Sequence, residues 1–234
     1  LDWKRSVITN VPETVPFASH NSLIEDASKV GASSYIENSK ILGSSNIGNG
    51  SVVSNLTLRD ISVPGDVVLH GLRLKSGKYI VRIYGVHDNP KGTLEQDTFF
   101  LGQPIRKFMD NYQLTESDIW PDQPAYLWFA NLYPICDTME QAVHYAIILY
   151  HMAHSSVSVD ETAASTGGTA LSADEIAAWK TAPRMSLYSS FNEADVKSVI
   201  PWTQELKTRI LVDKFIHKLE SGVYYKEALA VFGI

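Results

Sequence analysis

Branched apolar residues recur every five or six positions between Ser33 and Leu74, and Ser, Asn and Gly fill the gaps. An amphipathic helix would repeat near 3.6 residues and a half-buried strand near 2, so neither fits. A step near six is typical of a left-handed parallel β-helix, in which each short strand is one side of a triangular coil. The inward positions are Ile36, Ile41, Ile47, Val52 or Val53, Leu58, Val63, Val68 and Leu74.

The residues beside these aliphatics also suit a β-helix. Gly and Asn tolerate the positive φ that tight corners require, and small residues fit within the corners. The pattern predicts a short array of about two to four coils, ending near Gly77. A few irregular antiparallel strands are the alternative explanation.

After the coils the pattern changes. A longer strand rich in β-branched and aromatic residues is predicted from Lys78 to Gly85, and helical spacing follows from residue 98 onward. The sequence therefore predicts an α+β protein, with a β-helix, closing strand and turn over residues 1–92. A mainly helical region over residues 93–234 follows, with a flexible linker near 155–170.

Several helices of this second region are marked by their ends. Asp137 or Thr138 can cap a helix that runs to about Ala153, and Ser172 begins a capping box. Asn192 is a candidate cap for a short helix over residues 193–199. Pro201 suits the first turn of the longest helix, which Gly222 would end. The final residues predict a short terminal helix.

Composition excludes several classes of protein. The 234 residues are 44% hydrophobic and 20% charged, with a net charge of −6. No stripe of Lys and Arg interleaves with aromatic residues, so nucleic acid is not an expected partner. The longest apolar run, Ala146 to Tyr150, is far too short to cross a bilayer. Cys136 is the only cysteine, which leaves no disulfide framework or thiolate metal cage.

Two features concern the context of the chain. Asn55-Leu56-Thr57 is a glycosylation sequon, but no signal peptide precedes it, so we interpret it as a coincidence in a cytoplasmic protein. The chain starts at Leu1 and its first residues resemble the middle of a protein. We therefore expect it to be an excised piece of a longer chain.

Motifs for common chemistries are missing. Gly43 and Gly48 have the spacing of a phosphate loop, but Asn49 stands where the loop needs Lys. GxGxxG, GxSxG and HExxH do not occur. His151 and His154 are three residues apart on a predicted helix that also carries His144, but no convincing third ligand completes a metal site. We expect no metal, and interpret these histidines as solvated or capping residues near a helix C-terminus.

His87, Asp88 and Lys91 form the most reaction-like cluster, because a base, a carboxylate and a cation lie within five residues after a strand. Asp-Asn-Pro is also turn chemistry, and on spacing alone the turn is favoured. Suitable phosphate partners elsewhere are the guanidinium groups of Arg59, Arg73 and Arg82. The aromatic group of Tyr126, Trp128, Phe129 and Tyr133 is interpreted as core in preference to a sugar-stacking platform.

Three stretches resemble a known family. GVHDNPK at Gly85 to Lys91 follows the predicted β-helix, and YLWFANLYPICDT includes Leu127 to Pro134. Together with Arg184 to Leu187 and the long helix, they are similar to the L-fucokinase/GDP-fucose pyrophosphorylase family. The resemblance extends in order over most of the chain.

The resemblance implies a cytoplasmic enzyme that joins fucose 1-phosphate to GTP, giving GDP-fucose and pyrophosphate, with Mg²⁺ and GTP as cofactor and co-substrate of the parent enzyme. Such nucleotidyltransferases carry a glycine-rich loop with Arg and Lys ahead of their β-helix, and this chain has none. We therefore expect a module that shapes the sugar-phosphate site or mediates assembly, binds no cofactor itself and is inactive alone. No catalytic residue is transferred. His87, Asp88 and Lys91 become candidates for binding the sugar phosphate.

The expected partners are a sugar phosphate or nucleotide sugar, the missing nucleotidyltransferase domain, and possibly a second copy of the chain. Two alternative functions stay open. One is a hexapeptide-type acyltransferase, for which His70 is the one histidine within the coils and hence the candidate base. The other is a non-enzymatic assembly scaffold, since a stack of coils leaves unpaired backbone groups at its ends.

Overall fold

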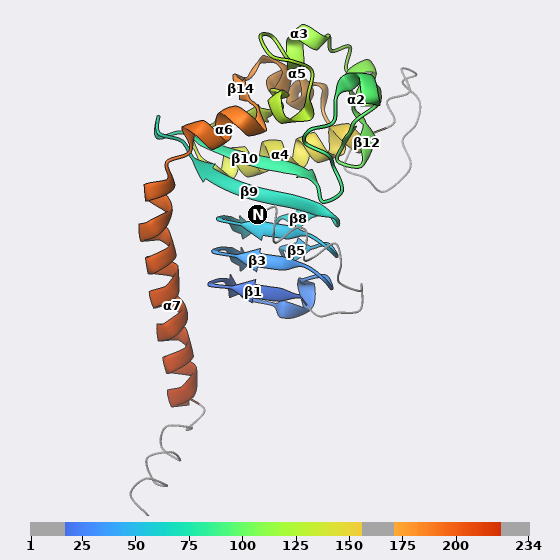
Figure 1. Ribbon diagram of the computed structural model, residues 1–234. Helices are drawn as coiled ribbons and strands as arrows, with labels where there is room; N and C mark the ends of the chain where they lie inside the picture. Colours follow the sequence, from blue (N-terminus) through green and yellow to red (C-terminus); the bar gives the residue numbers. More distant parts are fainter. Residues whose placement is uncertain (1–16, 156–170, 221–234) are drawn as a thin grey trace, which may run out of the picture.

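The computed structural model describes residues 17–155 and 171–220. Its N-terminal part is a parallel β-solenoid of about three turns, and a mainly helical part follows, so the predicted α+β class is confirmed (Figure 1). The predicted lead-in over residues 1–16, most of the predicted linker (156–170) and the terminal helix with Gly222 lie outside the described residues. Among the described helices, none combines the length and apolar character needed to cross a membrane.

Three sheets run along the solenoid. The largest has the strand order β1-β3-β6-β9-β10, in which β10 pairs antiparallel with β9 and the other pairs are parallel. Its strands are β1 (Ala18–His20), β3 (Tyr35–Glu37), β6 (Val52–Ser54), β9 (Val67–Arg73) and β10 (Tyr79–Gly85). The second sheet contains β2 (Leu23–Ile24), β4 (Lys40–Leu42) and β7 (Thr57–Arg59), and the third contains β5 (Asn46–Ile47) and β8 (Ser62–Val63).

The register gives the length of a coil. Ala18 pairs with Tyr35 and Tyr35 with Val52, so each of these coils has 17 residues, and the step from Val52 to Val68 has 16. One corner carries an asparagine in each coil, at Asn21, Asn38 and Asn55, with φ of 47°, 47° and 58°. Asparagine adopts this left-handed conformation more readily than most residues, which explains its place at the corner.

Aliphatic side chains fill the solenoid from the inside. In the largest sheet Ile36, Val53 and Leu69 are register partners and are fully buried. Ile24, Ile41 and Leu58 stack in the same way in the second sheet. Backbones of adjacent coils also approach closely, since a Cβ added to Gly48 would lie 2.3 Å from the backbone nitrogen of Gly65. These stacks confirm the aliphatic step of five or six residues.

Replacing Leu58 by Ala should therefore destabilise the solenoid. Leu58 is completely buried in the middle of its stack, so the change removes apolar contacts and leaves a cavity. We expect the free energy of unfolding in urea to fall by about 2–5 kcal/mol. Thr57→Ala, at an exposed position of the same strand, is the matched control and should change it by less than about 0.5 kcal/mol. Equal effects of the two variants would contradict the stacked core.

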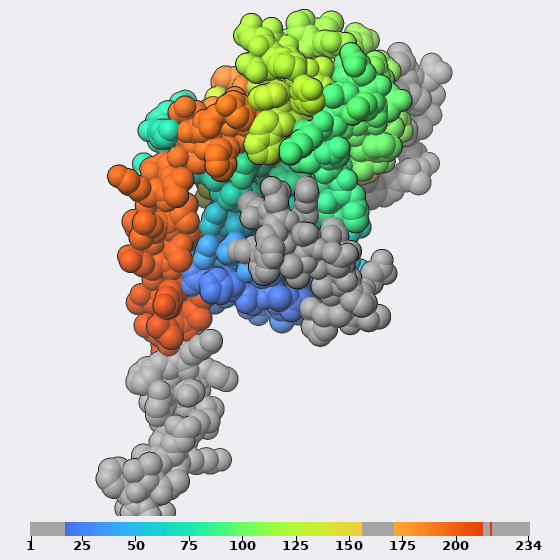
Figure 2. Space-filling view, in the orientation of Figure 1, coloured from blue at the N-terminus to red at the C-terminus, as the bar shows by residue number. Residues whose placement is uncertain are grey.

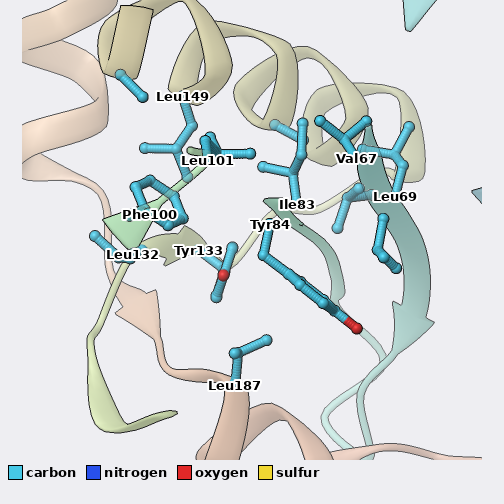
Figure 3. Close-up of a cluster of buried hydrophobic side chains, with 14 of the residues drawn as sticks. Val67, Leu69, Ile83, Tyr84, Phe100, Leu101, Leu132, Tyr133, Leu149 and Leu187 are labelled. Carbon is cyan, nitrogen blue, oxygen red and sulfur yellow. The ribbon is translucent and has the colours of Figure 1, made fainter. Parts of the chain in front are cut away.

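Helices cover one end of the solenoid. Helix α4 (Met139–His154) packs on β9 and β10, and Figure 3 shows Ile83 pointing toward this helix near Leu149. The same view shows Tyr84 pointing away from α4. Around this core lie η2 (Leu94–Gln96), β11 (Phe99–Phe100), β12 (Gln103–Pro104), α2 (Ile105–Asn111), α3 (Glu116–Ile119), η3 (Leu127–Phe129), β13 (Tyr133–Pro134), α5 (Ala173–Thr181) and β14 (Arg184–Met185). A further short helix, η1 (Ala27–Lys29), lies within the solenoid.

Cys136 lies in this core and is 5% exposed. Burial, together with the nearby Asp137 carboxylate, raises the pKa of its thiol to about 11 from 9.0. At pH 8 this lowers the thiolate fraction about a hundredfold, and only the thiolate attacks a disulfide reagent. We expect the thiol to react with Ellman's reagent at least about a hundred times faster in urea than in the native protein. Equal rates would show that Cys136 is accessible in the folded state.

The last three helices are α6 (Leu187–Glu193), η4 (Val196–Ser198) and α7 (Val199–Glu220). The prediction of a helix over residues 193–199 capped by Asn192 is wrong. Ser186 caps α6 instead, because its hydroxyl accepts from the backbone N–H of Ser189, and Asn192 lies inside that helix. Pro201 does lie in the first turn of α7, as predicted.

Helix α7 runs beside the coils and continues past β1 (Figure 1). Trp202 Nε1 donates to the carbonyl of Asn38 at 2.9 Å, and Lys40 Nζ lies 4.4 Å from the centre of the Trp202 ring. Asn21 Nδ2 donates to the Thr203 carbonyl, and Leu206 is fully buried. These contacts fix the first half of α7 against the corner that carries the asparagines.

Candidate functional site

A polar row crosses the outer face of the largest sheet. Register places His20, Glu37, Ser54, His70 and Arg82 opposite one another on five successive strands. Each lies one position beyond a residue on the inner, apolar face, so its side chain points to the outside of the solenoid. Ser54, His70 and Arg82 are nevertheless buried, at 2%, 8% and 8% exposure.

The row forms the floor of a cleft of about 780 Å³. The helical part supplies the opposite wall, from Trp128 in η3 and from Leu187 and Phe191 in α6, and the segment leading into α7 closes one side. Figure 2 shows α6 and α7 (orange) beside the blue and teal solenoid. Tyr84 lines the cleft as well, on the face of β10 that lies away from α4.

Backbone pairing fixes this wall to the sheet. Ala194 forms a bridge with Leu74, just after β9, and the Asp195 N–H donates to the Arg73 carbonyl at 2.8 Å. The Lys75 N–H donates to the Glu193 carbonyl, and Lys75 Nζ donates to the Asn192 carbonyl at 2.6 Å. The end of β9 therefore sets the width of the cleft.

The floor carries a contact chain of three side chains. Arg82 Nη2 contacts His70 Nδ1, and His70 Nε2 lies 3.0 Å from Asn55 Nδ2. Glu37 continues the row, because Ser54 Oγ donates to Glu37 Oε2 at 3.4 Å. A buried guanidinium held in one orientation is well suited to bind a phosphate or carboxylate through paired hydrogen bonds.

The lining is more basic than acidic. Arg73, Lys75 and Arg82 contribute permanent positive charges, against the carboxylates of Glu37 and Asp195. The apolar wall faces this charged floor. A ligand that combines an anionic group with a less polar ring would match both surfaces.

Two of the residues predicted from the GVHDNPK run lie elsewhere together. His87 and Asp88 line a separate depression of about 480 Å³, and Lys91 is not among its lining residues. His87 and Lys91 are exposed. Of that run, only Pro90 lines the large cleft.

Asp88 has a structural position in this loop. It is 3% exposed, and its carboxylate accepts from the backbone N–H groups of Gly85 and Leu101, both at 2.7 Å, and of Gly102 at 3.1 Å. These bonds join the end of β10 to the turn after β11. The role of these residues in binding a sugar phosphate stays a prediction.

The aromatic group divides between core and surface. Tyr133 is buried as predicted, but Tyr126 is 39% exposed and Trp128 and Phe129 are half-buried. Phe129 packs edge-on against Tyr188 of α6, with ring centroids 5.1 Å apart. Sequence reasoning treated the group as one core cluster and missed that Trp128 lines the cleft.

The remaining candidates do not form a metal centre. His144 Nε2 lies 3.6 Å from Glu175 Oε1, and the His154 ring stacks on Tyr150. Within residues 17–155 and 171–220, no group of three His, Cys, Asp or Glu side chains could hold a metal ion. The described residues do not fit a bound Mg²⁺, and no step below uses one.

The fold and cleft define a class of protein: a β-solenoid whose outer polar row faces a helical wall. A family described as the fucose pyrophosphorylase domain matches residues 3–138, more than half of the chain, and the chain belongs to this family. A bifunctional fucokinase/GDP-fucose pyrophosphorylase from Arabidopsis thaliana is 41% identical over 54 residues, which are 22% of this chain and 5% of that protein. The chain thus spans a small part of that relative. No solved structure matches it.

Proposed function

We propose that this chain is the module of a GDP-fucose pyrophosphorylase that binds the sugar phosphate, fucose 1-phosphate. The observation that carries the proposal is the buried Arg82 guanidinium, held by His70 on the floor of a cleft of about 780 Å³. The printed activity of the Arabidopsis relative and the family supply the substrate class.

Each surface of the cleft has a role in this proposal. Arg82 binds the phosphate, since a planar guanidinium matches two phosphate oxygens. Leu72, Leu187 and Trp128 cover the less polar face of the sugar ring, where an aromatic side chain also excludes water. The cleft thereby orients the phosphate oxygen that attacks the α-phosphorus of GTP, with release of pyrophosphate. GTP and its Mg²⁺ belong, in this proposal, to a nucleotidyltransferase domain that acts with the module.

The alternative of an acyltransferase needs His70 to act as a general base on a ligand. His70 is instead engaged on both ring nitrogens, by Arg82 and by Asn55. A base must be within reach of the proton that it removes, and neither nitrogen is directed at a substrate here. The contacts therefore favour an anion-binding role over acyl transfer.

A thermal-shift titration of the chain tests the proposal, with fucose 1-phosphate, GDP-fucose, GTP and acetyl-CoA as ligands. A ligand that binds only the native state stabilises it by about 2.7 kcal/mol at a hundredfold excess over Kd. We expect fucose 1-phosphate and GDP-fucose to raise the melting temperature, and free fucose to raise it much less. A response to acetyl-CoA alone, or to none of the four ligands, would overturn the proposal.

A further inference from the structure

The hydrogen-bonding capacity of the floor residues fixes the state of His70. A guanidinium has five N–H donors and no acceptor. The contact between Arg82 Nη2 and His70 Nδ1 is therefore a hydrogen bond only if Nδ1 has its lone pair free to accept. His70 is then the neutral imidazole, with its hydrogen on Nε2.

The second contact of the ring requires an acceptor. His70 Nε2–H is a donor, but the atom 3.0 Å away is Asn55 Nδ2, which is a donor too. Asn55 Oδ1 is buried and has no hydrogen-bond partner among the described residues. A half-turn of the carboxamide, which hardly changes its shape, brings Oδ1 to His70 Nε2. Both the ring and the amide oxygen then have partners.

We propose that Asn55 and His70 are positioning residues, which hold the Arg82 guanidinium toward the cleft through the chain Asn55 Oδ1, H–Nε2 of His70, Nδ1 of His70 and H–Nη2 of Arg82. The inference deepens the proposed function and rests on it for the ligand. The corner conformation of Asn55, with φ of 58°, supplies the rigid end of the chain. The positive charge offered to the phosphate is that of Arg82, while His70 stays neutral.

This assignment explains why the asparagine at this corner differs from those below it. Asn21 Nδ2 donates to Asn38 Oδ1 at 2.8 Å, so the lower two side chains bond to one another along the corner. Asn55, in the next coil, bonds sideways to His70 of β9. The last member of the corner series therefore links the corner to the cleft floor.

Matched substitutions at Asn55 test the chain of contacts. Asn55→Gly keeps the left-handed corner without strain and removes the acceptor, whereas Asn55→Asp keeps an acceptor and tolerates the same φ. With fucose 1-phosphate as probe in calorimetry on the full chain, we expect Asn55→Gly to weaken binding by about tenfold. Asn55→Asp should stay within about threefold of the unchanged protein.

Substitutions at His70 add a rescue. Gln can accept from Arg82 through its amide oxygen and donate to Asn55 through its amide nitrogen, whereas Leu can do neither. His70→Gln should therefore bind fucose 1-phosphate more tightly than His70→Leu by about tenfold. Equal affinities of the Gln and Leu variants, or an Asn55→Gly variant that binds like the unchanged chain, would overturn the inference.

Nitrogen NMR of the ligand-free chain gives a readout that needs no ligand. We expect His70 to show a protonated Nε2 and an unprotonated Nδ1 at pH 7, and to lose this tautomer preference in Asn55→Gly. A doubly protonated ring, or a hydrogen on Nδ1, would refute the inference. If fucose 1-phosphate does not bind at all but NMR shows the Nε2–H tautomer, the proposed function fails and the hydrogen-bonded chain stands.

Discussion

Replacing Arg82 by Gln will weaken the binding of fucose 1-phosphate by about 10- to 150-fold. Arg82 is 8% exposed on the cleft floor, and hydrogen bonds to a charged group contribute about 1.5–3 kcal/mol. Calorimetric titration of the variant measures the change in Kd. Lys at this position keeps the charge but loses the planar pair of donors, so Arg82→Lys should fall between the two.

Arg59 provides the matched control. It lies on the exposed face of β7, in the second sheet, and does not line the cleft. Arg59→Gln makes the same change of charge and should leave the affinity within about twofold. An equal loss for both variants would mean that only the net charge matters, and an unchanged Kd for Arg82→Gln would place the phosphate elsewhere. His87→Gln and Lys91→Gln in the same titration test the alternative predicted site.

Replacing Asp88 by Ala will lower the free energy of unfolding by about 3–5 kcal/mol. Three backbone N–H groups donate to its carboxylate, and the substitution leaves them without acceptors in a buried loop. Urea denaturation monitored by tryptophan fluorescence measures the change. Asp88→Asn should be less severe, because one amide oxygen remains to accept.

Asp97→Ala is the control from the same loop region. Its carboxylate lies 3.3 Å from Arg106 Nε, but the side chain is 77% exposed, and exposed ion pairs contribute at most about 1 kcal/mol. A loss below about 1 kcal/mol for Asp88→Ala would contradict the structural role of Asp88. Weaker binding of fucose 1-phosphate without loss of stability would instead support the prediction that Asp88 binds the substrate.

The solenoid could be predicted because its information is local. Each side of a coil holds one inward aliphatic, so a step of five or six residues reports the fold directly. The strand that follows and the helix from Met139 were predictable for the same reason. Helix α6 was not, because Ser186 and Asn192 are both good cap residues and only the packing of Leu187 into the cleft wall decides between them.

The cleft could not be predicted because its residues are joined only by register and by the return of the chain. Glu37, Ser54 and His70 are 17 and 16 residues apart, and Arg82 faces them only through the antiparallel pairing of β10. A signal was present. Aligning the sequence at the coil length, rather than at one side of a coil, would have placed these three polar residues in one column. The wall from α6 has no such signal.

The constant coil length has a consequence for how proteins of this architecture can change size. The floor of the cleft uses the coils from β3 upward, whereas β1 and β2 belong to the outermost coil. A block of 17 residues inserted or removed at that outer end would shift every later strand by one full turn and keep its neighbours. The solenoid could thus act as a spacer of adjustable height, which sets how far the cleft stands from whatever lies beyond the first coil.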